Sequence, residues 1–381
     1  MKLGARLASL VISDICSMSR ACDAIGGINL GQGICDLPTP APVAEAARDA
    51  ITANRVVYTV PYGIAPLREA VGAKIARQYQ LDYDPPSEIV VTSGATGGFA
   101  AACLALFDPG DEIILFEPYY EYHLNTVLTF GLKPVLVPTR PPDWTVDFDA
   151  LVQAITPKTR GIVVCTPTNP SGKVWTIEEL DRLAAILEEH DLIAVTDEIY
   201  EHIVFDGHKH VPLATRGAAR KRTVTLSGLS KTFAITGWRL GYLTAPPELA
   251  RRLTVAHDLL YVCAPTPLQY GVVAGLGMPE HYYADLSKSY AVKREIVCSA
   301  LQDAGLTPYV PRGAYYVLAD VRRLGAPTAK AAAMLILERV KIASVPGTSF
   351  YVDPVGETLT RFCFAKEDDV LEEAARRLRS L

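Results

Sequence analysis

Short apolar runs bounded by turn residues recur through the middle of this chain and alternate with helical patterns. Residues 177–190 are typical of the latter, with apolar side chains at spacings of three and four. Because parallel strands need a crossover between them, the alternation predicts a largely parallel sheet with helices on both faces. Functional side chains are expected where these strands end. The predicted strands are residues 89–92, 111–116, 133–137, 161–165, 192–196 and 223–226.

The pattern changes after about residue 280, where a long helical segment spans residues 282–304. Candidate strands follow at residues 313–320, 342–345 and 359–365, with another helix over residues 328–340. This predicts a smaller α+β lobe. A second lobe also suits the length, because 381 residues are too many for one small core.

Composition excludes several classes of protein. A net charge of −5 favours neither nucleic acid nor an anionic membrane as a partner. No apolar stretch approaches the ~20 residues of a membrane span. The eight cysteines include no C-x-x-C pair, which argues against a zinc site and a disulfide scaffold and favours a reducing cytoplasm. The apolar run near the amino terminus is short and soon followed by Asp14, so no secretory signal is expected.

Residues 227–242 form a polar, glycine-punctuated segment that contains Lys231 and, eight residues later, Arg239. A lysine amine can bond covalently to an aldehyde, and the planar fork of an arginine suits a phosphate. The pair therefore predicts a site for an aldehyde that carries a phosphate. The alternative is that Lys231 is an ordinary solvated lysine on the surface, but the residues around it do not favour this interpretation.

A glycine cluster at residues 94–98 directly follows the predicted strand 89–92 and opens a predicted helix. Small residues there let backbone N–H groups approach a phosphate at the helix N-terminus. The Thr96 hydroxyl could contribute as well. Taken alone, such a cluster is equally typical of a tight turn.

The Lys231 segment resembles the cofactor-lysine motif of class I/II aminotransferases of fold type I, the aspartate-aminotransferase superfamily. Other motifs follow in that family's chain order, and the resemblance spans nearly the whole chain. It implies pyridoxal 5'-phosphate as cofactor and an α/β fold. A large domain (41–284) would hold a mostly parallel seven-stranded sheet between helices, beside a smaller α+β domain (285–381). Residues 1–40 would form an N-terminal arm and part of that smaller domain.

The resemblance also implies roles for individual residues. Lys231 would hold the cofactor and move the α-proton, and Asp197 would face the pyridine nitrogen. Asn169 and Tyr200 would bind the ring's phenolic oxygen, while Tyr120 would stack on the ring.

For the phosphate, the resemblance implies Gly94, Ala95, Thr96 and Arg239, together with Tyr58 from a partner subunit. This last role requires a homodimer with shared active sites. Many relatives carry a serine three residues before the lysine, where this chain has Gly228. Ser227 or Ser230 would then take the place of that hydroxyl.

Arg361 matches the arginine that binds the substrate α-carboxylate, and Gly31 and Asn169 match its neighbours in the family. No second arginine for a side-chain carboxylate is evident. Aromatic, methionine-like, glutamine-like or unusual amino acids are therefore expected to exchange amino groups with 2-oxo acids by a ping-pong mechanism. The chain looks most similar to kynurenine and glutamine-phenylpyruvate aminotransferases, although Ile34-Cys35 departs from the residues that relatives commonly have.

Two alternatives stay open at this point. Lyases and cyclases with this fold share the cofactor-binding residues, because they begin from the same chemistry. A non-catalytic sensor is a weaker alternative, since it would be expected to lose Lys231, Asp197 or Arg239.

Overall fold

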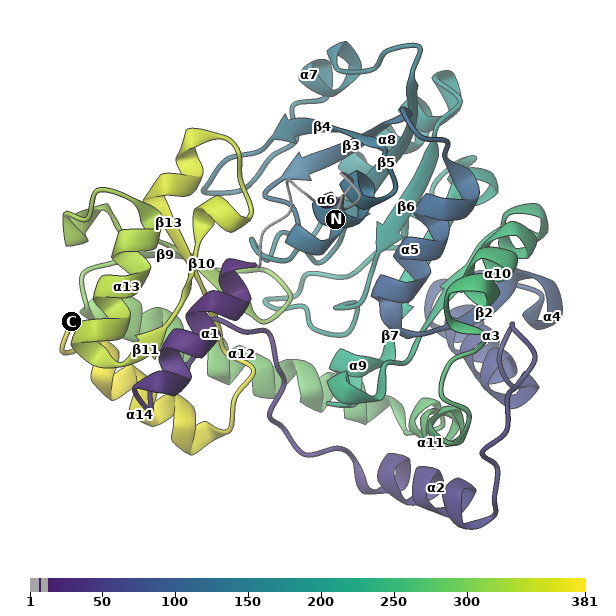
Figure 1. Cartoon of the computed structure of the whole chain (residues 1–381), viewed down its shortest axis with the longest axis horizontal. Helices are drawn as coiled ribbons and strands as arrows, with labels where there is room; N and C mark the ends of the chain where they lie inside the picture. Colours follow the sequence, from purple (N-terminus) through teal and green to yellow (C-terminus); the bar gives the residue numbers. More distant parts are fainter. Residues whose placement is uncertain (1–6, 8–12) are drawn as a thin grey trace, which may run out of the picture.

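The computed structural model describes Leu7 and residues 13–381. Most of the amino-terminal apolar run considered above as a secretory signal lies outside these residues. The chain folds into a large lobe around a seven-stranded sheet and a smaller lobe around a four-stranded sheet (Figure 1). Among the described residues, no helix combines the length and apolar composition needed to cross a membrane.

All six strands predicted for the middle of the chain are present in the large sheet. A seventh strand, β8, was missed; it begins at the end of the segment 227–242 and runs antiparallel to both of its neighbours, β2 and β7. The sheet is therefore mostly parallel, as predicted. In spatial order the strands are β2 (Ile89–Thr92), β8 (Gly241–Thr244), β7 (Thr223–Gly228), β6 (Ile193–Asp197), β5 (Thr159–Cys165), β3 (Glu112–Glu117) and β4 (Lys133–Pro138).

Helices cover both faces of this sheet, because its strands present apolar side chains to each side. Helices α5 (Gly94–Leu106), α6 (Glu121–Thr129) and α10 (Pro247–Tyr261) pack on one face. The other face is covered by α7 (Phe148–Gln153) and α8 (Ile177–Glu189) at one end and by α3 (Ala65–Tyr79) and α11 (Thr266–Leu276) at the other. The short helix α4 (Pro85–Glu88) leads directly into β2, the short helix α9 (Leu229–Thr232) directly follows β7, and α2 (Ala41–Thr52) packs on α11.

The smaller sheet has the order β12 (Val345–Pro346), β13 (Leu359–Cys363), β10 (Tyr316–Asp320) and β9 (Thr307–Tyr309), all antiparallel. The predicted strand 342–345 is in fact two strands in two sheets. Its first part, β11 (Ile342–Ala343), pairs with β1 (Ile28–Asn29) near the amino terminus. The helices of this lobe are α1 (Asp14–Ala24), α12 (Glu280–Asp303), α13 (Ala329–Val340) and α14 (Asp368–Leu378).

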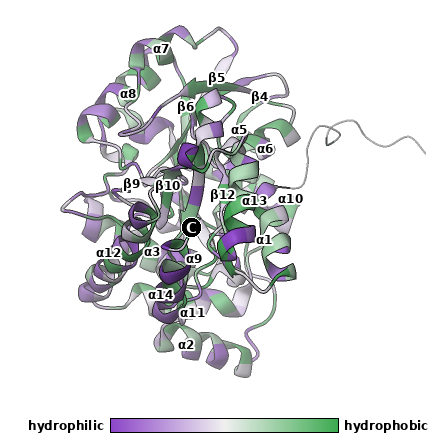
Figure 2. Cartoon of the chain, turned by 90° about the vertical axis from the view of Figure 1, so that its left-hand side faces the viewer, coloured by the Kyte–Doolittle hydropathy of each residue, from purple (hydrophilic) through white to green (hydrophobic). Residues whose placement is uncertain are grey.

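Helix α1 lies against β1, β11 and β12, so part of the amino-terminal segment packs on the smaller lobe (Figure 1). The division at residues 40 and 284 stays a prediction, and residue 284 falls within the continuous helix α12. The outer helices α2, α8 and α14 carry both hydrophilic and hydrophobic residues around their circumference (Figure 2). Short 3₁₀ turns occur at Leu213–Thr215, Ala219–Arg222, Thr236–Trp238, Arg322–Leu324, Gly347–Ser349 and Pro354–Thr358.

Candidate active site

A cavity lies where β5, β6 and β7 end, and residues of the smaller lobe complete its wall. It brings together ten of the residues singled out in the sequence: Ala95, Thr96, Tyr120, Asn169, Asp197, Tyr200, Ser230, Lys231, Arg239 and Arg361. Gly94 and Gly31 adjoin it through contacts with Arg239 and Arg361. Tyr58 does not belong to it and is 80% exposed elsewhere. The remaining lining residues are Ile15, Gln32, Gly33, Ile34, Tyr122, Cys165, Ile199 and Tyr316.

Lys231 lies in α9, directly after β7 ends at Gly228. Its Nζ donates a 3.3 Å hydrogen bond to the Gly33 carbonyl and lies 5.5 Å from the centre of the Tyr315 ring. Burial lowers the pKa of Lys231 to about 8, because the charged form loses its hydration. A substantial fraction of the amine is therefore neutral, and nucleophilic, near physiological pH.

Asp197 ends β6 and is 6% exposed. His123 Nε2 lies 3.1 Å from one carboxylate oxygen, and the Ile199 N–H donates to the other at 3.3 Å. Tyr120 was predicted from the sequence, but His123, three residues later, was missed. The signal was its spacing, because α6 begins directly after Tyr120 and carries His123 to the same side as that ring, 5.3 Å away.

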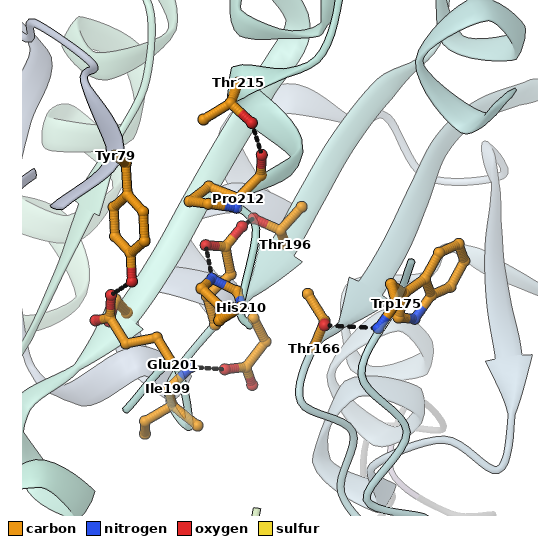
Figure 3. A network of polar contacts seen from close by, with 12 residues as sticks. Tyr79, Thr166, Trp175, Thr196, Ile199, Glu201, His210, Pro212 and Thr215 are labelled. Atoms are coloured by element: carbon orange, nitrogen blue, oxygen red, sulfur yellow. Dashed lines mark hydrogen bonds and ion pairs between the residues drawn. The ribbon is translucent and has the colours of Figure 1, made fainter. Parts of the chain in front are cut away.

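Two glutamates in the same segment bond to groups outside the cavity. Glu198 accepts from Thr196 at 2.8 Å and lies 2.8 Å from His210 Nε2. Glu201 accepts from Tyr79 at 2.6 Å (Figure 3). It also pairs with Lys74. These bonds fix the segment from Asp197 to Tyr200 through partners that do not line the cavity.

The structure corrects the expectation for Ser227. Its hydroxyl is buried and donates to Glu201 at 2.7 Å. Ser227 therefore belongs to a polar cluster outside the cavity, formed with Lys74, Tyr79 and Glu201. The absence of a serine at Gly228 also has a steric reason, since a Cβ there would lie 2.4 Å from Ile199 Cδ1. Ser230 does line the cavity, and its hydroxyl donates to the Leu240 carbonyl at 3.3 Å.

The N-terminus of α5 and Arg239 form a cradle on one side of the cavity. The side chain of the N-cap residue Ser93 forms no hydrogen bond with the first backbone N–H groups of this helix, which are therefore open to a ligand. Gly94 has a φ of +72°, and a Cβ at this position would lie 2.6 Å from Arg239 Nη2. The same Nη2 donates to the Thr96 hydroxyl at 3.1 Å. A guanidinium against open backbone N–H groups suits an anion such as phosphate.

Arg361 of β13 is 1% exposed and lies between the Tyr316 and Phe350 rings, 4.3 and 4.7 Å from their centres. Its guanidinium donates to Asn169 Oδ1 at 2.9 Å and to the Gly31 carbonyl at 2.6 Å. Among the described residues it forms no ion pair with a carboxylate. A buried cation paired only with neutral oxygens is suited to receive an external anion.

The buried ion pair between Lys74 and Glu201, outside the cavity, leads to a prediction about stability. Replacing the buried Lys74 by methionine is expected to lower the free energy of unfolding by about 3–5 kcal/mol, because Glu201 keeps its charge without its partner. Lys74 lowers the pKa of Glu201, so its contribution should be present at neutral pH and lost in acid as Glu201 is protonated. Urea unfolding at pH 7 and in acid measures both effects. Equal stability of the two proteins at pH 7 would contradict the prediction.

The sequence matches the family model of aminotransferase class I and II over residues 25–378. The solved structure of N-succinyldiaminopimelate aminotransferase from Mycobacterium tuberculosis is 36% identical and superposes with a TM-score of 0.96, covering 100% of both chains. A methionine aminotransferase of Escherichia coli is 30% identical with a TM-score of 0.96, also over 100% of both chains. Kynurenine–oxoglutarate transaminase 3 of Mus musculus is 35% identical, covering 91% of this chain and 83% of its own.

A family match over most of the chain and relatives above 30% identity agree with the cavity's content of lysine, aspartate and two arginines. The chain belongs to the class I and II aminotransferases and is a transaminase that depends on pyridoxal 5'-phosphate.

Proposed function

We propose that this transaminase acts on neutral L-amino acids with apolar or aromatic side chains and passes their amino group to a 2-oxo acid. One observation carries the proposal. Of the two arginines that line the cavity only Arg361 is buried, and the wall that is left for a substrate side chain is formed by Ile15, Ile34, Tyr122 and the amide of Gln32. Such a wall would bury an apolar group and would leave a second carboxylate unpaired.

The residues present fit pyridoxal 5'-phosphate. Gly94, Ala95, Thr96, Ser230 and Arg239 would hold its phosphate. When bound, the cofactor supplies an aldehyde for the amino group and a ring that draws electrons from the substrate α-carbon.

The ring would be held by four further residues of the cavity. Asp197 would keep the ring nitrogen protonated, with His123 fixing the carboxylate. Tyr120 would cover the ring, and Tyr200, with a hydroxyl that donates to Tyr316 at 3.2 Å, would reach its phenolic oxygen together with Asn169.

Lys231 has two tasks under this proposal. Its neutral amine would hold the cofactor through the aldehyde, and the same amine would move the substrate α-proton as a general base. Arg361 and Asn169 meanwhile grip the α-carboxylate and orient the bond to that proton.

A substrate panel tests the proposed specificity. The value of kcat/KM for methionine and phenylalanine should exceed that for aspartate and glutamate by about 10²-fold or more, because an unpaired buried carboxylate is strongly disfavoured. Leucine and glutamine serve as matched neutral controls. Preference for a dicarboxylic amino acid as donor would contradict the proposal.

We also propose that the enzyme is a homodimer in which Tyr58 reaches the partner's site. The support is an exposed apolar patch that we define as Val56, Val57, Tyr58, Val60, Leu259, Leu260, Tyr261 and Val262. Thr266, four residues after Val262, donates to the Val57 carbonyl at 2.7 Å, which joins the two segments. Exposed apolar side chains gathered on two segments that are joined in this way are typical of a protein interface.

Replacing Leu259, which is 77% exposed in this patch, by aspartate is expected to raise the dimer dissociation constant about 30-fold or more. The introduced charge would have to be desolvated at the interface. The matched control is Val292→Asp, on α12 outside the patch and 62% exposed. Sedimentation velocity over a range of concentrations measures both. A wild-type monomer at micromolar concentration, or equal behaviour of the two variants, would contradict the dimer.

We further propose that the enzyme is located in the cytoplasm. All eight cysteines are free thiols, and five of them are buried, which suits a reducing compartment. Fractionation of the source cells with an antibody against the enzyme would test this, and recovery outside the cytoplasmic fraction would contradict it.

A further inference from the structure

The turn that leads from β2 into α5 is held by two side chains outside the cavity. The Thr92 hydroxyl donates to the Gly94 carbonyl at 2.9 Å. From the other side, His257 Nε2 accepts the backbone N–H of Ser93 at 2.9 Å. Because the Ser93 side chain does not cap α5, these contacts fix the turn that aims the first N–H groups of the helix.

His257 lies on α10 and is completely buried. Burial lowers the pKa of His257 to about 4, so its ring is neutral at physiological pH. A neutral imidazole accepts a hydrogen bond with only one nitrogen. Since Nε2 faces the Ser93 N–H, the proton of the ring is assigned to Nδ1.

Nδ1 of His257 has no hydrogen-bond partner among the described residues. An unpaired N–H inside a protein is unfavourable, and an apolar side chain of similar size would avoid it. For the packing of α10, the His257 ring therefore has no advantage over an apolar side chain of similar size. What it adds is the acceptor for Ser93.

The end of α10 also lies directly on the first turn of α5. The Tyr261 ring is 5.1 Å from that of His257, and a Cβ at Gly97 would lie 3.3 Å from Tyr261 Cε2. His257 does not line the cavity, so it can act on a ligand there only through the turn.

We propose that His257 is a positioning residue for the phosphate cradle, which it sets by accepting the Ser93 N–H and so orienting Ala95 and Thr96 toward the cavity. This inference rests on the proposed role of α5 and Arg239 in holding the cofactor phosphate. It assigns a function to a residue of α10 that makes no contact with the cavity itself.

The test compares two ligands that differ only in the phosphate. Cofactor-depleted protein is titrated with pyridoxal 5'-phosphate and with pyridoxal, for the wild type, His257→Phe and His257→Gln. The Phe variant keeps a ring against Tyr261 but has no acceptor, so its affinity for pyridoxal 5'-phosphate should fall about tenfold. Its affinity for pyridoxal should be unchanged. The Gln variant should recover the lost affinity, because its amide oxygen can accept the same N–H.

Equal losses for both ligands would show a merely structural role and overturn the proposal, as would full affinity of the Phe variant. If the Phe variant does not fold, His257→Leu and His257→Gln supply the same comparison. Failure of the underlying assignment has its own signature. A wild-type protein that binds pyridoxal as tightly as pyridoxal 5'-phosphate would show that α5 holds no phosphate, whatever the variants do.

Discussion

Replacing Lys231 by alanine is expected to lower kcat about 10⁴-fold, the upper range for loss of a positioned general base. The same variant should lose covalent attachment of the cofactor, because Lys231 is the one lysine among the described residues that lines the cavity. Steady-state kinetics measures the first effect. Mass spectrometry of the protein after borohydride reduction measures the second, since reduction makes the attachment permanent.

The pH dependence of attachment follows from the same residue. The pKa of Lys231 is lowered to about 8, so the neutral amine grows as pH rises through that value. The rate at which cofactor-depleted protein takes up the cofactor should therefore rise through pH 8 and then level off. A rate that keeps rising toward pH 10 would indicate a lysine with an ordinary pKa.

Lys293 supplies the control for the alanine variant. It is also buried, but it lies on α12, where it donates to the Lys366 carbonyl at 2.8 Å and pairs with Asp368. Lys293→Met is expected to cost stability and to keep both kcat and the covalent attachment. Cofactor mass that persists on the Lys231→Ala protein would contradict the assignment of Lys231.

Replacing Asp197 by asparagine is expected to lower kcat about 10²–10³-fold while the protein still binds the cofactor. Asparagine keeps the shape of the side chain and a hydrogen bond with His123, but it carries no charge to hold the ring nitrogen protonated. Steady-state kinetics and equilibrium titration of the cofactor measure the two quantities separately.

The neighbouring residue makes an unusually close control. Glu198 is likewise a buried carboxylate beside a histidine, His210, but it lies outside the cavity. Glu198→Gln should change stability more than kcat. If both substitutions lowered kcat equally, the effect would belong to the segment as a whole and not to the carboxylate in the cavity.

Much of the large sheet could be predicted from the sequence, because buried parallel strands appear in a sequence as continuous apolar runs. Strand β8 could not, since its first two residues belong to the glycine-punctuated segment of Lys231 and its four residues give only a short apolar signal. The strand predicted over residues 342–345 failed differently. Ser344 separates two pairs of residues that bond to different partners, and only the distant strands β1 and β13 decide this.

The site was predicted where a motif keeps its residues together in the chain, as around Lys231 and Asp197. Ser227 and Ser230 were both predicted as candidates because sequence distance from the lysine does not say which way a residue faces, and only Ser230 lines the cavity. The Ser227 hydroxyl is satisfied by Glu201, a partner from another strand end. Ile15 was missed for the opposite reason, since nothing near it suggests that α1 reaches the cavity.

The central claim is that Lys231, Asp197 and Arg361 line one cavity in which an amino acid gives its amino group to the cofactor. A half-reaction tests it most directly: purified enzyme with bound cofactor is mixed with methionine, without any 2-oxo acid, and its visible spectrum is followed. We expect that the absorbance of the lysine-bound cofactor disappears and that one equivalent of the 2-oxo acid of methionine is formed, with the cofactor left in its amine form. A spectrum that stays unchanged while ammonia and an oxo acid accumulate over many turnovers would contradict it.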